Sequence, residues 1–473
     1  MDNESFRKYA HQLVDWMADY RENIRQYNVK SNVKPNDILK QLPLKAPSIG
    51  EDFTTIFTDF SNIILPGVTH WQHPSFFAYY PSNTSPASIL GEMLTSTLGL
   101  QCMSWQTSPA ATELEERVMA WLVDMLGLPD DFVGVIQDGA SSATLCSLLS
   151  AREKRTSCES NRSGLYNQKP FTVYCSDQAH SSVDKAVRIA GFGEVHLRKI
   201  SVDENFSIND VLFEDMVIKD IDDGFSPLWA VASLGTTSSC SFDPLDRMGK
   251  ICQKYNIWLH VDAAYAGTAL VLPEFRFLIK GIEYVDSFVF NPHKWMLTNF
   301  DCSAYFVKNK DYLLKCFEIL PEFLKTKEDL QVNNYRDWGI GLGRRFRALK
   351  LWFVIRNYGV ENIQNMVRDQ IQLAQKIVSK MKEENDFEIL APVVLNVICF
   401  RYNPSHINKD SKLNLINKTL LESLNESGKL YLSHTKLNGK YTLRMVIASP
   451  VIEEREMFEI WNLIKSIARK ISL

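Results

Sequence analysis

The chain has 473 residues, of which 45% are hydrophobic and 23% are charged, and its formal net charge is -4 at pH 7. This is the composition of an ordinary globular protein, and the length predicts two or three structural units. A weakly acidic chain with no long run of lysine or arginine is a poor candidate for binding nucleic acid or an anionic membrane.

The first 85 residues are expected to form helices and extended linker without a core of their own. Residues 4–28 carry apolar side chains at helical spacing on one face, which either the rest of the chain or a second subunit must cover. Shorter helices are predicted at 37–41 and 53–65. Residues 70–82 are rich in aromatic side chains and contain two prolines, so they form either a pocket wall or a packed linker.

Helices and short apolar strands alternate from about residue 86 to residue 300, which predicts an α/β domain with right-handed crossovers. The strands are β-branched and almost continuously apolar, as buried parallel strands are. Ligands of such a domain gather at the carboxyl ends of the strands. The expected helices are 86–99, 109–126, 141–153, 181–190 and 245–255, and the expected strands are 133–136, 171–175, 228–233, 257–261, 286–290 and 303–307.

The alternation is lost between residues 310 and 338, where the charged stretch 325–331 predicts a loop. Two helices are expected next, at 345–358 and 360–384. The remainder suits a small α+β domain with three or four strands and helices at 412–426 and 453–470. The predicted domains are therefore an N-terminal helical segment (1–85), a large α/β domain (86–348) and a small C-terminal domain (349–473).

The nine cysteines are scattered, odd in number and never arranged as CxxC. This usage predicts reduced thiols rather than a disulfide framework or a zinc site. The first five residues are polar and acidic, unlike a secretory signal, and no apolar run approaches the roughly 18 residues of a membrane span. We therefore expect a cytoplasmic protein.

Residues 137–144 (Gln-Asp-Gly-Ala-Ser-Ser-Ala-Thr) lie between a predicted strand and a predicted helix. Small residues let the backbone approach an anion, and the free amides of a helix N-terminus favour phosphate. The alternative is an ordinary helix cap formed by Ser141 or Ser142.

Two further strands end in a carboxylate and an imidazole. Asp262 ends an apolar strand, where a buried carboxylate is costly unless it is paired. A protonated pyridine nitrogen is a suitable partner, while a strand-end cap and a metal site shared with His260 are the alternatives. His180 could stack on a planar cofactor, act as an acid or cap a helix, and residues 234–239 add hydroxyl groups.

Lys294 follows the strand 286–290 in a stretch that is otherwise apolar or aromatic. Lysine is rarely buried, and desolvation of an ammonium group leaves a nucleophilic amine near neutral pH. Such an amine can form a Schiff base with pyridoxal phosphate, although its head group could instead lie in solvent. One lysine, one carboxylate, one imidazole and one anion-binding turn together favour a site for this cofactor.

These segments closely resemble the group II decarboxylases that use pyridoxal phosphate and, within them, the aromatic L-amino acid decarboxylases. The resemblance rests on residues 291–295 (Asn-Pro-His-Lys-Trp) and 260–265 (His-Val-Asp-Ala-Ala-Tyr), and it extends from about residue 4 to residue 450. The other matching segments are 77–81, 108–115, 177–182 and 342–347.

The resemblance implies a fold type I homodimer with pyridoxal 5'-phosphate as cofactor and an active site at the subunit interface. The large domain would hold a mainly parallel seven-stranded sheet, and residues 1–85 would wrap around the partner as a dimerisation arm. At matching positions, Lys294 would form the Schiff base, Asp262 would pair with the ring nitrogen, and His180 would stack on the ring and assist acid–base steps.

The same resemblance implies the remaining contacts of the site. The phosphate would be held by Ala140, Ser141 and Asn291 with His293 nearby, and Thr237 and Ala264 would line the ring. An aromatic L-amino acid substrate would be bound by Tyr79, Pro81, Ser82, Gln101, Met103 and Gly343, with Gln101 and Met103 contributed by the partner subunit. Ser82 and Met103 depart from the side chains that are common in animal members.

Phe323 is the departure that bears on the product. In these decarboxylases a loop tyrosine protonates the α-carbon after carbon dioxide leaves, and phenylalanine has no hydroxyl group to do so. Plant aromatic aldehyde synthases resemble this pattern and form aldehyde, ammonia and peroxide with oxygen. The alternative is that Phe323 only packs the closed loop while His180 or water delivers the proton. We expect decarboxylation of an aromatic L-amino acid to the amine, with oxidative deamination as the alternative.

Gly343 bears on the substrate, because related plant tyrosine decarboxylases carry serine there and glycine leaves room for an indole. The other explanation is that the backbone before a helix at Arg344 requires glycine. Two other classes of protein would differ from this sequence pattern. An aminotransferase would share the fold but should carry an arginine for the α-carboxylate, and a cofactor-free binding protein would have no use for Lys294 and Asp262.

Overall fold

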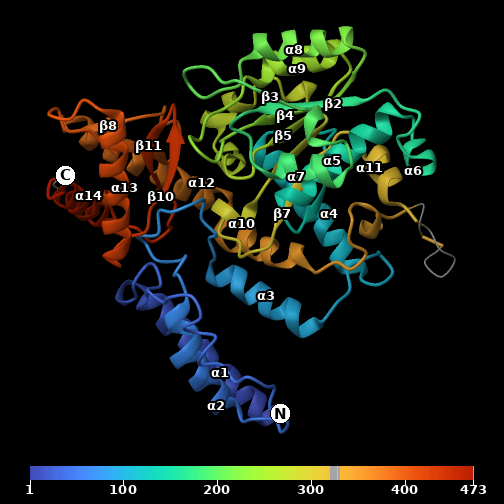
Figure 1. Cartoon of the computed structure of the whole chain (residues 1–473). Coiled ribbons are helices and arrows are strands. Elements are labelled where there is room, and N and C mark those ends of the chain that lie inside the picture. The colour runs from blue at the N-terminus through green and yellow to red at the C-terminus, as the bar shows by residue number, and fades with distance from the viewer. Residues whose placement is uncertain (320–326, 329–330, 472–473) are drawn as a thin grey trace. The chain divides into compact units, whose positions relative to one another are not determined.

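Seven strands form one sheet in the computed structural model of the chain, which describes residues 1–319, 327–328 and 331–471 (Figure 1). Their order across the sheet is β1-β7-β6-β5-β4-β2-β3. The strands are β1 (Val133–Gln137), β2 (Phe171–Ser176), β3 (Leu197–Ile200), β4 (Ser226–Ser233), β5 (Trp258–Asp262), β6 (Ser287–Phe290) and β7 (Ser303–Val307). All neighbours pair in parallel except β7, which runs antiparallel to β1 and β6. The mainly parallel seven-stranded sheet is thus confirmed.

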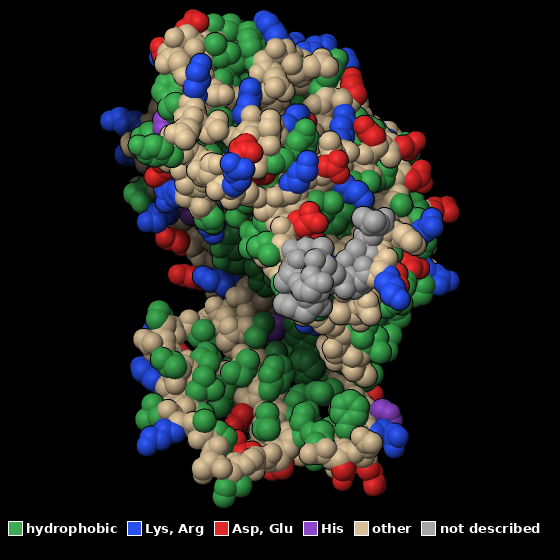
Figure 2. Space-filling model, turned by 90° about the vertical axis from the view of Figure 1, so that its right-hand side faces the viewer, with side chains coloured by type: hydrophobic (Ala, Val, Ile, Leu, Met, Phe, Trp, Pro, Cys, Tyr) green, Lys and Arg blue, Asp and Glu red, His purple; other side chains and the backbone are tan. Residues whose placement is uncertain are grey.

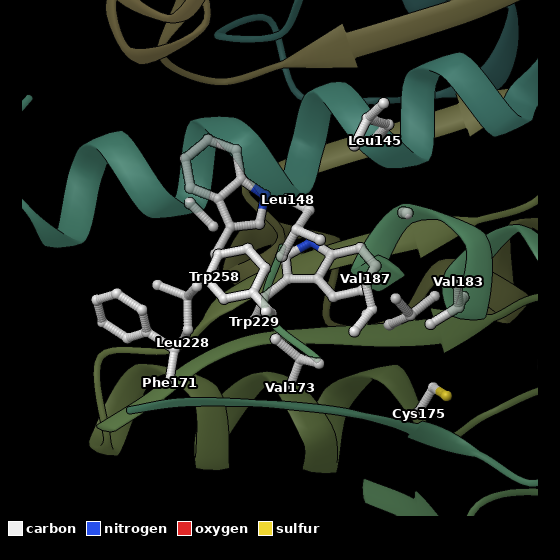
Figure 3. Packing of buried hydrophobic residues seen from close by; sticks show 14 residues of the cluster. Leu145, Leu148, Phe171, Val173, Cys175, Val183, Val187, Leu228, Trp229 and Trp258 are labelled. Atoms are coloured by element: carbon white, nitrogen blue, oxygen red, sulfur yellow. The ribbon is translucent and has the colours of Figure 1, made fainter. Parts of the chain in front are cut away.

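Helices cover both faces of this sheet (Figure 1). One face packs on α5 and α7, and Figure 3 shows how Leu148 of α5 and Val187 of α7 meet Trp229 and Trp258 of β4 and β5. Both indole rings are buried, and Trp229 donates a hydrogen bond from its Nε1 to Ser147 Oγ over 3.1 Å, which satisfies its polar atom. The helices of this unit are α3 (Pro86–Leu98), α4 (Pro109–Leu126), α5 (Ala140–Arg155), α6 (Ser160–Ser163), α7 (Ser182–Ile189), α8 (Asp210–Asp222), α9 (Leu245–Lys254), α10 (Pro292–Trp295), α11 (Lys310–Phe317) and α12 (Arg347–Lys382).

The sheet and these helices, apart from residues 376–382 at the end of α12, belong to one compact unit, residues 82–375 with 391–398. The other unit combines residues 1–81, 376–390 and 399–473, and its four-stranded sheet has the order β10-β11-β9-β8. Its elements are α1 (Asn3–Glu22), α2 (Phe53–Asp59), β8 (Phe387–Ile389), β9 (Val397–Tyr402), α13 (Asp410–Glu426), β10 (Ser433–Leu437), β11 (Lys440–Val446) and α14 (Glu454–Ala468). Phe77 is hydrogen-bonded beside this sheet, because its N–H donates to the carbonyl of Tyr431 and its carbonyl accepts from the N–H of Val446, the last residue of β11.

The units do not coincide with the three domains predicted from the sequence. Residues 1–81 group with the C-terminal segments, and the expected boundary at residue 348 falls inside α12. The two helices predicted around residue 359 are present as two halves of α12, because Gly359 has a left-handed φ of 72° that breaks the helix. No helix in the described part of the chain is long and apolar enough to cross a bilayer.

The predicted helix at residues 37–41 was wrong. The segment forms hydrogen-bonded turns that follow Asn36, whose φ of 73° is left-handed and incompatible with a helical start. Conversely, β3 and α8 had not been predicted, and α11 lies where the sequence pattern had seemed lost.

Candidate active site

Lys294 lies in the single turn of α10, directly after β6. Its N–H donates to the carbonyl of Asn291 over 2.9 Å, and its own carbonyl accepts from the N–H of Asn83 over 3.3 Å. The next residue, Trp295, is fully buried, and its ring stacks on Tyr265 with centroids 4.8 Å apart. The two hydrogen bonds anchor the backbone of Lys294. The residue is half-buried, so part of its side chain stays accessible.

Asp262 ends β5, the strand between β4 and β6. Its Oδ1 accepts a hydrogen bond from the N–H of Ala264 over 3.0 Å, which orients the carboxylate at the strand end. In the sheet register Asp262 lies opposite Ser233 on one side and Val289 on the other. Its side chain is only half-buried, so this carboxylate can meet a ligand at the carboxyl edge of the sheet.

His180 follows β2, and the charges of Asp262 and Lys294 both affect the pKa of its ring. Desolvation lowers the pKa of His180, the charge of Lys294 acts in the same direction, and the charge of Asp262 opposes them. The Nδ1 atom accepts the backbone N–H of Ser182 over 3.1 Å, so the neutral ring carries its proton on Nε2. The imidazole is thus near enough to the carboxylate and the amine, which come from two other loops, for their charges to act on its ring.

The predicted phosphate turn forms the start of α5. Gly139 is extended at the N-cap, and the amides of Ala140 and Ser141 belong to the first turn, where helix geometry leaves N–H groups without an intrahelical partner. Ser141 is exposed and Ala140 is half-buried. These amides and the helix dipole suit an anion of the predicted kind.

Asn291 and His293 stand on the turn before Lys294 and are both buried. The Oδ1 atom of Asn291 has no hydrogen-bond partner among the described residues, and an unpartnered buried polar atom is unfavourable unless a ligand satisfies it. His293 accepts the N–H of Cys302 at Nδ1 over 2.9 Å, so its Nε2 carries the proton. Burial, helped by the charge of Lys294, lowers the pKa of His293 to about 3, so the ring is a neutral donor.

The two residues expected to line a ring lie in the turns after β4 and β5. Gly235 has a φ of 87°, and an added Cβ would lie 2.6 Å from the Cβ of Ala266, so this position requires glycine. Thr237 is exposed, and Ala264 follows Asp262 half-buried in the neighbouring turn. Both therefore lie on loops at the carboxyl ends of adjacent strands.

The positions expected to contact substrate are only partly brought together. Gln101 Oε1 accepts the N–H of Arg344 over 2.7 Å, which holds it beside Gly343, and both Gln101 and Gly343 are exposed. Met103 accepts an N–H from Arg336 over 2.8 Å. Ser82 begins this unit, whereas Tyr79 and Pro81 belong to the other unit, and Phe323 lies outside the described residues.

The idea that the backbone requires glycine at position 343 was wrong. Gly343 is absent from the residues with positive φ, and α12 begins only at Arg347. An added Cβ would instead lie 3.2 Å from Gln101 Nε2, so the position is limited by its neighbour rather than by its backbone.

Sequence reasoning missed the charged residues that support this segment. Arg344 is buried and donates two hydrogen bonds to Glu115, of 2.6 and 3.2 Å, and a third to the carbonyl of Ile136 in β1. It lines a cavity of about 90 Å³ together with Asp138 and Arg347. Because Glu115 and Arg344 are 229 residues apart, no local pattern could reveal the pair.

Comparison with known proteins decides the family. The model described as the pyridoxal-dependent decarboxylase conserved domain matches residues 35–403. The chain belongs to this family. A phenylacetaldehyde synthase of Arabidopsis thaliana is 44% identical over 98% of this chain and 96% of its own length, and tryptophan decarboxylase 2 of Oryza sativa is 41% identical over 100% and 96%.

Two solved structures of decarboxylase-like enzymes cover almost the whole chain. The tryptophan decarboxylase of Catharanthus roseus with L-tryptophan superposes with a TM-score of 0.93 at 38% identity, covering 99% of both chains. The 4-hydroxyphenylacetaldehyde synthase of Rhodiola rosea also gives 0.93, at 34% identity, covering 100% of this chain and 99% of its own.

The cofactor of this pyridoxal-dependent decarboxylase is pyridoxal 5'-phosphate. The residues present fit it on their own geometry. The amide end of α5 and the unpartnered buried Asn291 suit the phosphate, and the half-buried Asp262 suits a protonated ring nitrogen. The half-buried Lys294 carries an amine that suits a Schiff base with this cofactor.

Proposed function

We propose that the protein decarboxylates an aromatic L-amino acid with pyridoxal 5'-phosphate and releases the amine. The observation that carries this proposal is the meeting of Lys294, Asp262 and His180 at the carboxyl edge of the sheet. The aromatic substrate is supported by the relatives, which include tryptophan and tyrosine decarboxylases that align over 98% or more of this chain.

Each residue has one physical task in this proposal. Lys294 binds the cofactor through its amine, and Asp262 holds a proton on the ring nitrogen, because an adjacent carboxylate stabilises that charge. Bound there, the cofactor supplies an electron-accepting ring that stabilises negative charge on the α-carbon when carbon dioxide leaves. His180 covers the ring, and its Nε2 proton is available for transfer.

The remaining residues bind and orient the reactants. Backbone amides of Ala140 and Ser141 and the side chains of Asn291 and His293 hold the phosphate. The ring is lined by Thr237 and Ala264, and the aromatic side chain of the substrate is bound by Tyr79, Pro81, Ser82, Gln101, Met103 and Gly343.

A second outcome is favoured by Phe323, which cannot donate a proton to the α-carbon. In that case one amino acid, one dioxygen and one water give one aldehyde, one carbon dioxide, one ammonia and one hydrogen peroxide. Oxygen is the oxidant and is reduced to peroxide by the electron pair left when the carboxyl group departs. Support comes from the relatives named phenylacetaldehyde synthase in Arabidopsis thaliana and in a rose cultivar, at 44% and 40% identity.

Product analysis separates the two outcomes. The purified enzyme is supplied with tryptophan, tyrosine, DOPA or phenylalanine under air, and carbon dioxide, amine, aldehyde and peroxide are measured together. If the amount of amine formed equals the amount of carbon dioxide released and no oxygen is consumed, the first outcome is supported. If the amount of peroxide equals the amount of aldehyde, the second outcome is supported. Phe323→Tyr is expected to raise the share of amine and lower peroxide, because it restores a hydroxyl donor at that position.

We also propose that the protein acts as a cytoplasmic homodimer. Four leucine and methionine side chains of α3 are exposed at helical spacing in the single chain (Leu90, Met93, Leu94 and Leu98). The N-terminal helices expose Phe6, Val14 and Ile56, and Figure 2 shows hydrophobic side chains gathered over this segment at the bottom of the view. A second copy that covers these faces would also complete a site whose Gln101 and Gly343 are exposed.

Solution mass tests the dimer. Leu90→Glu is expected to give a monomer with little activity, because a charge on an apolar interface face is strongly disfavoured. Leu415→Glu is the matched control, since Leu415 is a helical leucine with the same 53% exposure outside the N-terminal segment and α3. A Leu90→Glu variant that keeps the mass of the wild type would contradict the proposed interface.

A further inference from the structure

We propose that Arg347 and Asp301 are positioning residues that fix the imidazole of His293 at the phosphate end of the cofactor site. The inference rests on the phosphate-binding role proposed for His293. Arg347, the first residue of α12, donates from Nε to Asp301 Oδ1 and from Nη2 to Oδ2, both over 3.0 Å. Planar two-point pairing of this kind restrains orientation as well as distance.

The pair is well shielded from solvent. The side chains of Arg347 and Asp301 are 14% and 20% exposed. Burial alone would raise the pKa of Asp301, but the hydrogen bonds and charge of Arg347 outweigh it and leave that pKa lowered. The carboxylate is therefore ionised at neutral pH, and the ion pair holds the loop after Lys294 against the start of α12.

The link from this pair to His293 is a single peptide group. The N–H of Cys302 belongs to the peptide bond that joins Asp301 to Cys302, and it donates to His293 Nδ1 over 2.9 Å. The His293 N–H returns a hydrogen bond to the Cys302 carbonyl over 3.3 Å, and Cys302 is fully buried. Because a peptide group is planar, a rotation at Asp301 turns the donor away from the imidazole.

The direction of the Cys302 N–H determines whether His293 can donate a hydrogen bond to an anion. With Nδ1 engaged as an acceptor, the neutral ring presents its proton on Nε2 in one orientation. If the donor is displaced, the imidazole can turn or change tautomer, and its Nε2 is no longer held as a donor. Arg347 thus acts on the phosphate through Asp301 and Cys302, without needing to touch the cofactor.

A clamp that merely stabilises the loop is the competing explanation, because a shielded ion pair also ties α12 to this segment. The two explanations differ in what they predict for pyridoxal without its phosphate. A positioning role at the phosphate affects binding of pyridoxal 5'-phosphate only, whereas a loosened site weakens both ligands. The ratio of the two dissociation constants is therefore the decisive quantity.

The experiment is titration of the apoenzyme with pyridoxal 5'-phosphate and with pyridoxal, followed by cofactor absorbance, in wild type, Arg347→Lys and Asp301→Asn. We expect the dissociation constant of pyridoxal 5'-phosphate to rise about tenfold in both variants, as is usual when a residue that orients a ligand-binding imidazole is lost. That of pyridoxal should stay within about twofold of wild type. The control is Arg368→Gln, which breaks another α12 ion pair, with Glu274, and should change neither constant.

Coupling to His293 completes the test. Arg347→Lys in a His293→Gln background should add little further loss, because residues that act through one group are not additive. Equal losses for both ligands, or additive losses in the double variant, would overturn the inference. If His293→Gln itself leaves the affinity for pyridoxal 5'-phosphate unchanged, the role proposed for His293 fails first. If His293→Gln weakens it but Asp301→Asn does not, only the inference fails.

Discussion

Gly343→Ser is the substitution with the most specific expected effect on substrate choice. The backbone at position 343 tolerates any side chain, because its φ is not positive. The new Cβ would lie 3.2 Å from Gln101 Nε2, closer than ordinary packing contact, while the exposed Gln101 amide can move by a few tenths of an ångström. The hydroxyl can then accept a hydrogen bond from that amide, so we expect a change in stability within about 0.5 kcal/mol.

The effect on catalysis should be much larger than the effect on stability. If Gly343 faces the substrate, a side chain of two heavy atoms removes space of the size that separates an indole from a phenol. One methylene group in a specificity pocket changes discrimination by about 1–3 kcal/mol, which is roughly 10- to 200-fold in kcat/KM. We therefore expect the ratio of kcat/KM for tryptophan to that for tyrosine to fall by at least about tenfold.

Steady-state kinetics with tryptophan and tyrosine measure this ratio, and a thermal melt checks folding. Gly341→Ser is the matched control, because Gly341 and Gly343 both line the cavity beside Arg344. A Cβ added at Gly341 would have its nearest neighbour, the carbonyl oxygen of Gly343, at 3.6 Å. A ratio unchanged within about threefold in Gly343→Ser, or changed equally in Gly341→Ser, would refute the assignment of Gly343 to the substrate site.

Three further predictions concern charge and protonation. Asp262→Asn should lower kcat on the order of 100-fold while the protein stays folded, because the ring nitrogen loses its anionic partner; kinetics and circular dichroism test this. Glu115→Gln should destabilise the chain by roughly 3 kcal/mol, measured by denaturant unfolding, because it leaves the buried Arg344 charge half paired. Burial lowers the pKa of His260 to about 4 and of His293 to about 3, so the unfolded chain, with imidazole pKa values near 6.5, takes up protons first. Thermal stability should therefore fall as pH drops below 6.5, and His260→Gln should flatten that dependence.

The sheet could be predicted because its central strands carry their signal locally. Apolar, β-branched runs such as 228–233 and 257–261 have few other structures open to them, and both appear as β4 and β5 within a residue or two. The two elements that the sequence pattern does not predict, β3 and α8, are joined by an ion pair. β3 carries Arg198 and Lys199, which are unusual in a sheet, but Arg198 pairs with the buried Asp220 of α8 in a two-point ion pair.

The same distinction applies to the site. Lys294, Asp262 and His180 could be proposed from the sequence because a charged or imidazole side chain is conspicuous where an apolar strand ends. The pairs that hold their loops could not be found, since Arg347 lies 46 residues from Asp301 and Arg344 lies 229 residues from Glu115. The partner of a buried charge is fixed by the fold, and the sequence shows only that some partner must exist.

The proposed site has a buried part and an exposed part, and we expect amino-acid substitutions in the two parts to have different effects. Asn291 and His293 are buried within one chain, so changes to the phosphate contacts proposed for them should act on cofactor affinity. Gln101 and Gly343 are exposed, so the substrate contacts proposed for them depend on whatever covers these residues. A substitution on the exposed side can change substrate preference without disturbing packing, because surface positions away from buried networks contribute little to stability. This is a physical reason why decarboxylases and aldehyde synthases of different aromatic substrates can share one fold, as their solved structures do at 32–38% identity to this chain.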